Sequence, residues 1–236
     1  KKGFPYLTLE APASISHGII KADEAIVEAA TDDWNTYLQN NHRIVKFVPA
    51  SGAASRMFKN LYEFLNGGHD EPVTDFEHVF FDHIGFFGFY AALNEKCVEL
   101  YGKDITALMD EGHHRDVVAA LLNPEGLNFG QLPKGLLLFH LYENGTVRTP
   151  LEEHLVEGAL YAQDANKNVH VHFTVSPEHR ELFKAKVASV VARYEQEFGV
   201  KYDITFSEQK ASTDTVAADI HNELFRDTDG SLVFRP

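Results

Sequence analysis

Cysteine and positive charge are both scarce in this chain of 236 residues. Its single cysteine, Cys97, has no partner within the chain, which excludes the disulfide framework of a small secreted domain. Lysine and arginine number 21 against 35 aspartates and glutamates, so the formal net charge is −14. Such a charge repels a phosphate backbone, and we expect no nucleic acid polymer among the partners. One pocket can still be locally basic and bind a small anion.

Long hydrophobic runs are also missing. No apolar run reaches the length of about 18 residues that a membrane span needs, so we expect no membrane association. The opening segment Lys1–Pro5 is not followed by the apolar stretch of a signal peptide, and we expect a cytoplasmic protein. Because the chain lacks an initiator methionine and stops at Pro236 without a tail, we expect it to be a piece of a longer protein.

Short apolar strands alternate with amphipathic helices over most of the sequence. Hydrophobic residues make up 44% and charged residues 24%, as in an ordinary globular protein. Strands are predicted at 44–48, 169–175 and 202–206, and helices at 22–41, 56–65, 150–163 and 177–198. This alternation is typical of a mainly parallel sheet with helices on both faces. The predicted fold class is therefore α/β, a three-layer α/β/α arrangement.

Residues 72–122 show no strand alternation and are predicted to form a helical insertion. Thr74 can cap an aromatic-rich helix over about 75–101, and a second helical stretch covers about 104–122. The predicted organisation has three parts: a leader and helix at 1–43, an α/β domain at 44–71 and 123–236, and the insertion. Two short extended pieces, at about 214–218 and 231–235, close the chain.

The segment that most strongly indicates a ligand is the loop of small residues after the first strand. Small side chains let a backbone approach a ligand closely, and a following helix offers N–H groups and a positive dipole end to a phosphate. Arg56 and Lys59 would add charge within the first turns of that helix. A tight turn without a ligand is the alternative. The small residues in question are Ala50, Ser51, Gly52, Ala53, Ala54 and Ser55.

Three further segments carry polar side chains at expected loop positions. Lys134, between Pro133 and Gly135, could meet a phosphate as a fixed cation or be an ordinary surface lysine. Ser176 follows a predicted strand at the carboxyl edge, where open α/β sheets bind ligands, or it caps the next helix. Gln209 and Lys210 follow the next strand and could contact a nucleotide, or they form a polar loop.

Thirteen histidines raise the question of a metal site. His170 and His172 share one face of a predicted strand, which is a spacing found among metal ligands. No third ligand sits at a supporting spacing, so a metal-dependent hydrolase remains the least favoured of the readings. Cys97 lies mid-helix with only Lys96 as a basic neighbour, and we expect it to be unreactive.

Five segments together resemble sugar nucleotidyltransferases and pyrophosphorylases of the glycosyltransferase-A type. The loop resembles their signature loop, the Pro-Lys segment their Pro-Lys motif, and the other three their following helix and strands, all in the same order. The chain also looks like part of an uncharacterised bacterial family known only as a domain of unknown function. The segments are VPASGAASRMFK (48–59), LPKGLLLFH (132–140), RTPLEEHLVEGAL (148–160), VHVHFTVSPEHRELF (169–183) and ITFSEQK (204–210).

The resemblance implies roles for individual residues and a nucleotidyltransferase-like fold. The loop from Ala50 to Ser55 would cradle the nucleotide, Arg56 would hold the triphosphate, and Lys134 would face the attacked α-phosphate. Ser176 and Gln209 would line the nucleotide or sugar pocket. The resemblance also implies Mg²⁺, for which we assign no ligand in this chain and expect the ligands beyond Pro236.

The function expected from the resemblance is nucleotidyl transfer to a sugar 1-phosphate with release of pyrophosphate. The partners are then a nucleoside triphosphate, with UTP slightly preferred, and a sugar phosphate. The alternative is a non-catalytic domain that binds nucleotide or phosphosugar through the same phosphate cradle. Both readings require Arg56 and Lys134, which are far apart in sequence, to converge on one pocket.

Overall fold

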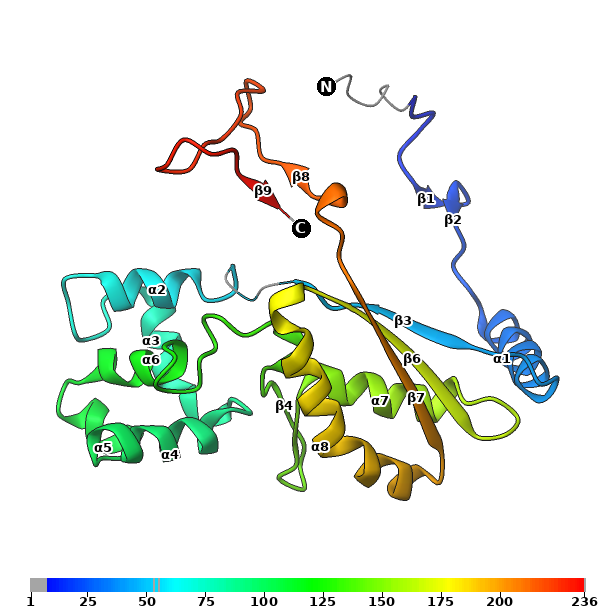
Figure 1. Ribbon diagram of the computed structural model, residues 1–236, viewed down its shortest axis with the longest axis horizontal. Helices are drawn as coiled ribbons and strands as arrows, with labels where there is room; N and C mark the ends of the chain where they lie inside the picture. Colours follow the sequence, from blue (N-terminus) through cyan, green and yellow to red (C-terminus); the bar gives the residue numbers. More distant parts are fainter. Residues whose placement is uncertain (1–7, 53, 55, 236) are drawn as a thin grey trace. The chain divides into compact units, whose positions relative to one another are not determined.

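The chain falls into two compact units, Lys1–His42 and Arg43–Pro236, and the computed structural model describes residues 8–52, 54 and 56–235 of it (Figure 1). The first unit contains the short paired strands β1 (Ser14–Ile15) and β2 (Gly18–Ile19) and the helix α1 (Glu24–Gln39). Asp23 caps α1 by accepting a hydrogen bond from the Ile26 amide at 2.9 Å. The predicted helix at 22–41 is thus confirmed.

The second unit is built on a parallel sheet of three strands in the order β3-β6-β7. These strands are β3 (Val45–Pro49), β6 (Asn168–Val175) and β7 (Lys201–Glu208), close to the three predicted ones. The register pairs Val48 with Phe173 and Phe173 with Phe206, so apolar side chains align across the sheet. A mixed α/β fold with a parallel sheet is therefore confirmed.

Helices α7 (Pro150–Tyr161) and α8 (Arg180–Phe198) pack on one face of this sheet (Figure 1). Each strand is added on the same side of the previous one, and right-handed crossovers then place both connecting helices on the same face. A second helical layer would require the strand order to reverse. The described strands show no reversal, so the predicted three-layer arrangement is not confirmed.

A second core joins the helices that lie between β3 and residue 123. These are α2 (Lys59–Asn66), α3 (Asp75–Asp82), α4 (Tyr90–Tyr101), α5 (Ile105–Asp110) and α6 (His114–Leu122). Leu61 and Phe64 of α2 pack in this core, although the sequence placed α2 with the sheet. The limits of the three predicted parts remain a prediction.

The two long helices predicted at 75–101 and 104–122 are each broken. A 3₁₀ turn (Ile84–Phe86) and Gly88 separate α3 from α4, and Gly88 could not carry a side chain because its Cβ would lie 2.9 Å from the Phe139 carbonyl oxygen. Gly112, at φ +82°, separates α5 from α6. The capping box at Thr74 is present as predicted.

Short elements complete the second unit. A turn at Asn144-Gly145 joins the antiparallel strands β4 (His140–Leu141) and β5 (Val147–Arg148). The two extended pieces near the end pair as β8 (Thr215–Val216) and β9 (Phe234–Arg235). None of the helices in the described ranges is long and apolar enough to cross a membrane. Further 3₁₀ turns cover Lys134–Leu136, Pro177–His179 and Ala211–Thr213.

The buried carboxylate of Glu152 ties α7 to α8 through two ion pairs. Its carboxylate is 2% exposed and lies 2.8 Å from both Lys186 Nζ and Arg193 Nη2. It also accepts from the Thr149 amide at 3.0 Å, which completes the capping box of α7. Burial raises the pKa of Glu152, but the hydrogen bonds from Lys186 and Thr149 outweigh burial and lower it overall.

Replacing this carboxylate should therefore destabilise the second unit in a pH-dependent way. We expect Glu152→Gln to lower the free energy of unfolding by about 2–3 kcal/mol, because it leaves two cations without their buried partner. The folded-state pKa lies below the unfolded value of about 4.3, so the difference from wild type is complete above about pH 5 and shrinks as the pH falls through the folded-state pKa. Urea denaturation of wild type and variant at several pH values measures this difference in the free energy of unfolding. Equal losses from Glu152→Gln and from the exposed Glu178→Gln would contradict this account.

Candidate functional site

The loops that follow β3, β6 and β7 meet at the carboxyl edge of the sheet. The Ala50 amide donates to the Thr174 carbonyl at 2.7 Å, and the Gln209 amide donates to the Val175 carbonyl at 3.0 Å. These bonds extend the parallel ladder by one residue beyond β3 and β7. The loop segments in which the sequence predicted ligand-binding residues are therefore held side by side.

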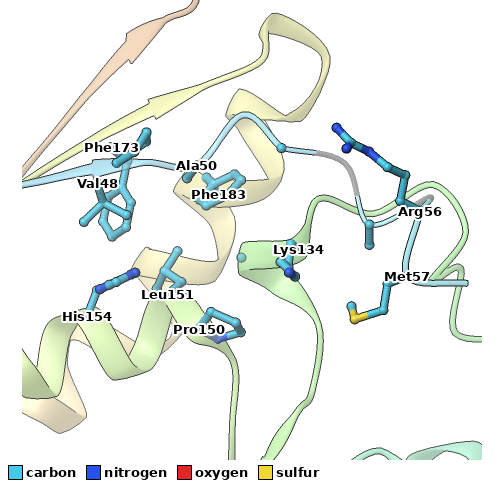
Figure 2. Close-up of a pocket in the computed structure, with 14 residues that line it drawn as sticks. Val48, Ala50, Arg56, Met57, Lys134, Pro150, Leu151, His154, Phe173 and Phe183 are labelled. Atoms are coloured by element: carbon cyan, nitrogen blue, oxygen red, sulfur yellow. The ribbon is translucent and has the colours of Figure 1, made fainter. Parts of the chain in front are cut away.

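A pocket of about 470 Å³ opens beside this edge, and both predicted catalytic cations line it (Figure 2). Figure 2 shows Arg56 and Met57 on one side of the pocket, His154 and Phe173 on the other, and Lys134 between them. None of the described residues that line it is a carboxylate. Within the described part of the chain, neither Arg56 nor Lys134 has an ion-pair or hydrogen-bond partner for its side chain. The lining residues are Val48, Pro49, Ala50, Gly52, Ala54, Arg56, Met57, Lys134, Gly135, Pro150, Leu151, His154, Phe173 and Phe183.

Lys134 reaches this pocket because its turn is fastened to the loop after β3. The Lys134 amide donates to the Gly52 carbonyl at 3.2 Å, which joins two segments that lie far apart in sequence. The next residue, Gly135, packs so tightly that an added Cβ would lie 2.9 Å from Cζ of Phe183. One backbone hydrogen bond and one close contact thus set the position of Lys134.

Arg56 lies in a turn ahead of α2 rather than inside the helix. The sequence predicted a helix from residue 56, but α2 begins at Lys59, and no side chain caps it. Lys59 points its charge at Glu63, with 3.5 Å between Nζ and Oε1, and it does not line the pocket. Arg56 and Lys59 are therefore not neighbours in one helical turn, as the sequence suggested.

The predicted loop residues divide into two groups. Ala50, Gly52 and Ala54 line the pocket, whereas Ser51 donates its hydroxyl to Gln209 Oε1 at 2.6 Å. Ala53 and Ser55 lie outside the described residues. Of the residues described in this loop, those with the smallest side chains are the ones that face the pocket.

Gln209 and Lys210 lie at the sheet edge without lining the pocket. Besides bonding to Ser51, Gln209 donates its amide group to Asp214 Oδ1 at 3.4 Å. Lys210 is exposed and precedes the 3₁₀ turn at Ala211–Thr213. The contact of Gln209 with Ser51 connects the ends of β3 and β7. The binding roles of Gln209 and Lys210 stay a prediction.

Ser176 is buried and acts as a structural link. Its hydroxyl donates to His179 Nδ1 at 2.7 Å, and His179 Nε2 donates to the Gln131 carbonyl at 3.1 Å. Ser176 neither caps a helix with its side chain nor lines the pocket. The relay joins the end of β6 to the segment that leads into Lys134.

His154 is the pocket residue that sequence reasoning missed. It lies on α7, one turn after Pro150, with its side chain 34% exposed. Burial lowers the pKa of His154, and the charge on Lys46 lowers it further, although Glu157 opposes the shift. The ring is therefore neutral at pH 7. The segment 148–160 had pointed to this helix, but nothing in the spacing singled out His154.

The Mg²⁺ that the resemblance implies does not fit the described residues. Magnesium prefers carboxylate and phosphate oxygens, and none of the described residues that line the pocket is a carboxylate. Across residues 8–52, 54 and 56–235, no group of three histidine, cysteine, aspartate or glutamate side chains could hold a metal ion. His170 instead contacts Asp203 at 2.8 Å, and His172 contacts Thr205 and Ser207.

Cys97 lies in α4, within a helix as predicted, and is buried in the helical core. Burial raises the pKa of its thiol to about 11, and nearby Asp116 adds to the shift. At neutral pH the residue is therefore a thiol and not a nucleophilic thiolate.

Comparison with known proteins assigns the family and nothing further. The family model "Domain of unknown function (DUF4301)" matches residues 1–236. The chain belongs to this family. No curated protein and no solved structure matches this DUF4301 chain. The resemblance to sugar nucleotidyltransferases therefore stays a prediction for this member of DUF4301, and its pocket is judged on its own geometry.

The close contact at Gly135 gives a test of how the pocket is built. We expect Gly135→Ala to lower the free energy of unfolding by about 1–3 kcal/mol and to displace Lys134, because the new methyl group meets the Phe183 ring. Gly52→Ala is the matched control, since its Cβ would enter open space, and it should change stability by less than about 0.5 kcal/mol. Thermal unfolding of both variants measures the difference. Similar stabilities for the two would show that Gly135 does not set the turn.

Proposed function

We propose that this pocket binds the phosphate groups of a nucleoside triphosphate and a sugar phosphate, and that the protein transfers a nucleotidyl group between them. The observation that carries the proposal is the convergence of Arg56 and Lys134 on one pocket without a carboxylate. In a chain of net charge −14, two cations left without an acidic partner among the described residues indicate an anionic ligand.

The proposed reaction is a displacement at the α-phosphate of the nucleoside triphosphate. An oxygen of the sugar 1-phosphate forms a bond to the α-phosphorus, and the bond from this phosphorus to the β-bridging oxygen breaks. Pyrophosphate leaves with that electron pair, and no atom is oxidised or reduced. The protein supplies positioning and charge neutralisation rather than a nucleophile, and we assign these roles to Lys134 and Arg56.

A second candidate is binding without chemistry. It is favoured by the absence of carboxylates from the described lining of the pocket, since these are the usual protein ligands of the magnesium ion in nucleotidyl transfer. In this case the pocket binds a nucleotide or a phosphosugar and leaves it unchanged. Binding and turnover must therefore be measured separately.

The binding step is tested with variants of the two cations. We expect Arg56→Ala and Lys134→Ala each to weaken the binding of UTP by about tenfold, because each removes a charge-assisted contact. Lys96→Ala, which removes an equal charge from α4 in the helical core, should leave the affinity unchanged. Isothermal titration calorimetry measures the affinities. If all three variants bind alike, the pocket is not the phosphate site.

The transfer step is tested by pyrophosphate release from UTP and glucose 1-phosphate. We expect release by the full-length protein, and a rate about 100-fold lower for Lys134→Ala, because its ammonium group neutralises charge that develops at the α-phosphate. A coupled phosphate assay with inorganic pyrophosphatase gives the rate. Binding of UTP without pyrophosphate release would favour the second candidate over transfer.

A further inference from the structure

The far side of the pocket from Arg56 holds a polar relay that phosphate binding does not use. His154 lines the pocket, and its Nδ1 lies 3.3 Å from Glu157 Oε2 on the next turn of α7. Glu157 Oε2 also accepts from Lys46 Nζ on β3 at 2.5 Å, and Lys46 contacts the Tyr161 hydroxyl. This chain of polar contacts therefore runs from His154 in the pocket, through Glu157, to Lys46 on β3.

The relay determines which nitrogen of His154 carries the proton. The hydrogen bond from Lys46 holds the pKa of Glu157 below its usual value, so its carboxylate is ionised and can only accept. His154 must then donate from Nδ1, which leaves Nε2 with a lone pair. No described residue forms a hydrogen bond with Nε2.

His154 is also the one described lining residue whose side chain can accept a hydrogen bond through nitrogen or oxygen. Arg56 and Lys134 can only donate, and the walls beside His154 are apolar, including Val48, Leu151 and Phe173. A fully ionised phosphate has no hydrogen to donate to Nε2. Nε2 of His154 therefore faces a different part of the ligand. That part carries a hydrogen-bond donor and lies beside the apolar wall of the pocket.

We propose that His154 accepts a hydrogen bond from a ring hydroxyl of a phosphorylated sugar, and so selects such a ligand over bare phosphate. The inference rests on the proposed function, because it assumes that Arg56 and Lys134 hold the phosphate. The sugar is either the ribose of the nucleotide or the ring of the sugar 1-phosphate. His154 is in this sense a specificity residue, while Glu157 and Lys46 position its ring.

The experiment compares ligands with and without a hydroxyl on wild type and two variants. His154→Phe keeps a planar ring but has no acceptor, and His154→Gln keeps an acceptor amide. We expect His154→Phe to bind glucose 1-phosphate or UTP about fivefold more weakly than wild type at about pH 8. The affinity for methyl phosphate should not change, because its dianion has neither a ring hydroxyl nor a P–OH hydrogen to donate. His154→Gln should restore the lost affinity to within about twofold.

The arms of this titration separate the possible outcomes. If His154→Phe loses affinity for glucose 1-phosphate, the hydroxyl donor belongs to the ring of the sugar phosphate. If it loses affinity for UTP but not for 2′,3′-dideoxy-UTP, the donor belongs to the ribose. An equal loss of affinity for methyl phosphate, no loss for any ligand, or a loss with UTP that persists in the dideoxy analogue overturns the inference. If wild type binds none of these ligands, the proposed function fails, and the inference falls with it.

Discussion

The candidate site depends on one backbone hydrogen bond between two distant segments, from the Lys134 amide to the Gly52 carbonyl. This bond fastens the turn that carries Lys134 to the loop after β3. The absence of a side chain at Gly135 lets that turn lie against Phe183 of α8. Together with the hydrogen bonds from Ser176 through His179 to the Gln131 carbonyl, these two contacts bring a lysine from beyond the helical core to the carboxyl edge of the sheet.

Charge is distributed unevenly over the described part of the chain. Most described cations outside the pocket are paired with carboxylates; at the helix interface, for example, the buried Glu152 pairs with Lys186 and Arg193. The pocket has the opposite character, because two cations line it and no described carboxylate does. Such a local reversal of sign in an acidic protein attracts an anion to one place on the surface.

The same strand order that builds the site explains how the layering departs from expectation. Since β3, β6 and β7 are added in one direction, α7 and α8 cover the same face. Because both helices pack on this face, Leu151 and His154 of α7 line the pocket next to Phe173 and Phe183. The opposite face carries polar pairs such as His172 with Ser207, at 2.8 Å. The helices thus supply the floor of the pocket and the acceptor at its far side.

The sequence by itself determined the local elements of this protein. Apolar β-branched runs predicted β3, β6 and β7, and the pattern over 150–163 predicted α7, because strand and helix patterns act over a few residues. The breaks at Gly88 and Gly112 escaped prediction. Gly88 is needed because Phe139, which is remote in the chain, approaches its backbone.

Only the tertiary structure decided which polar residues meet. Lys134 joins Arg56, whereas Ser51 pairs with Gln209 and Ser176 with His179, and none of these choices follows from spacing along the chain. His154 reaches the pocket because packing on Phe173 sets which side of α7 faces it. Local sequence governs short-range backbone energies, but the partners of a side chain are set by the order of the strands and by which residues pack between them.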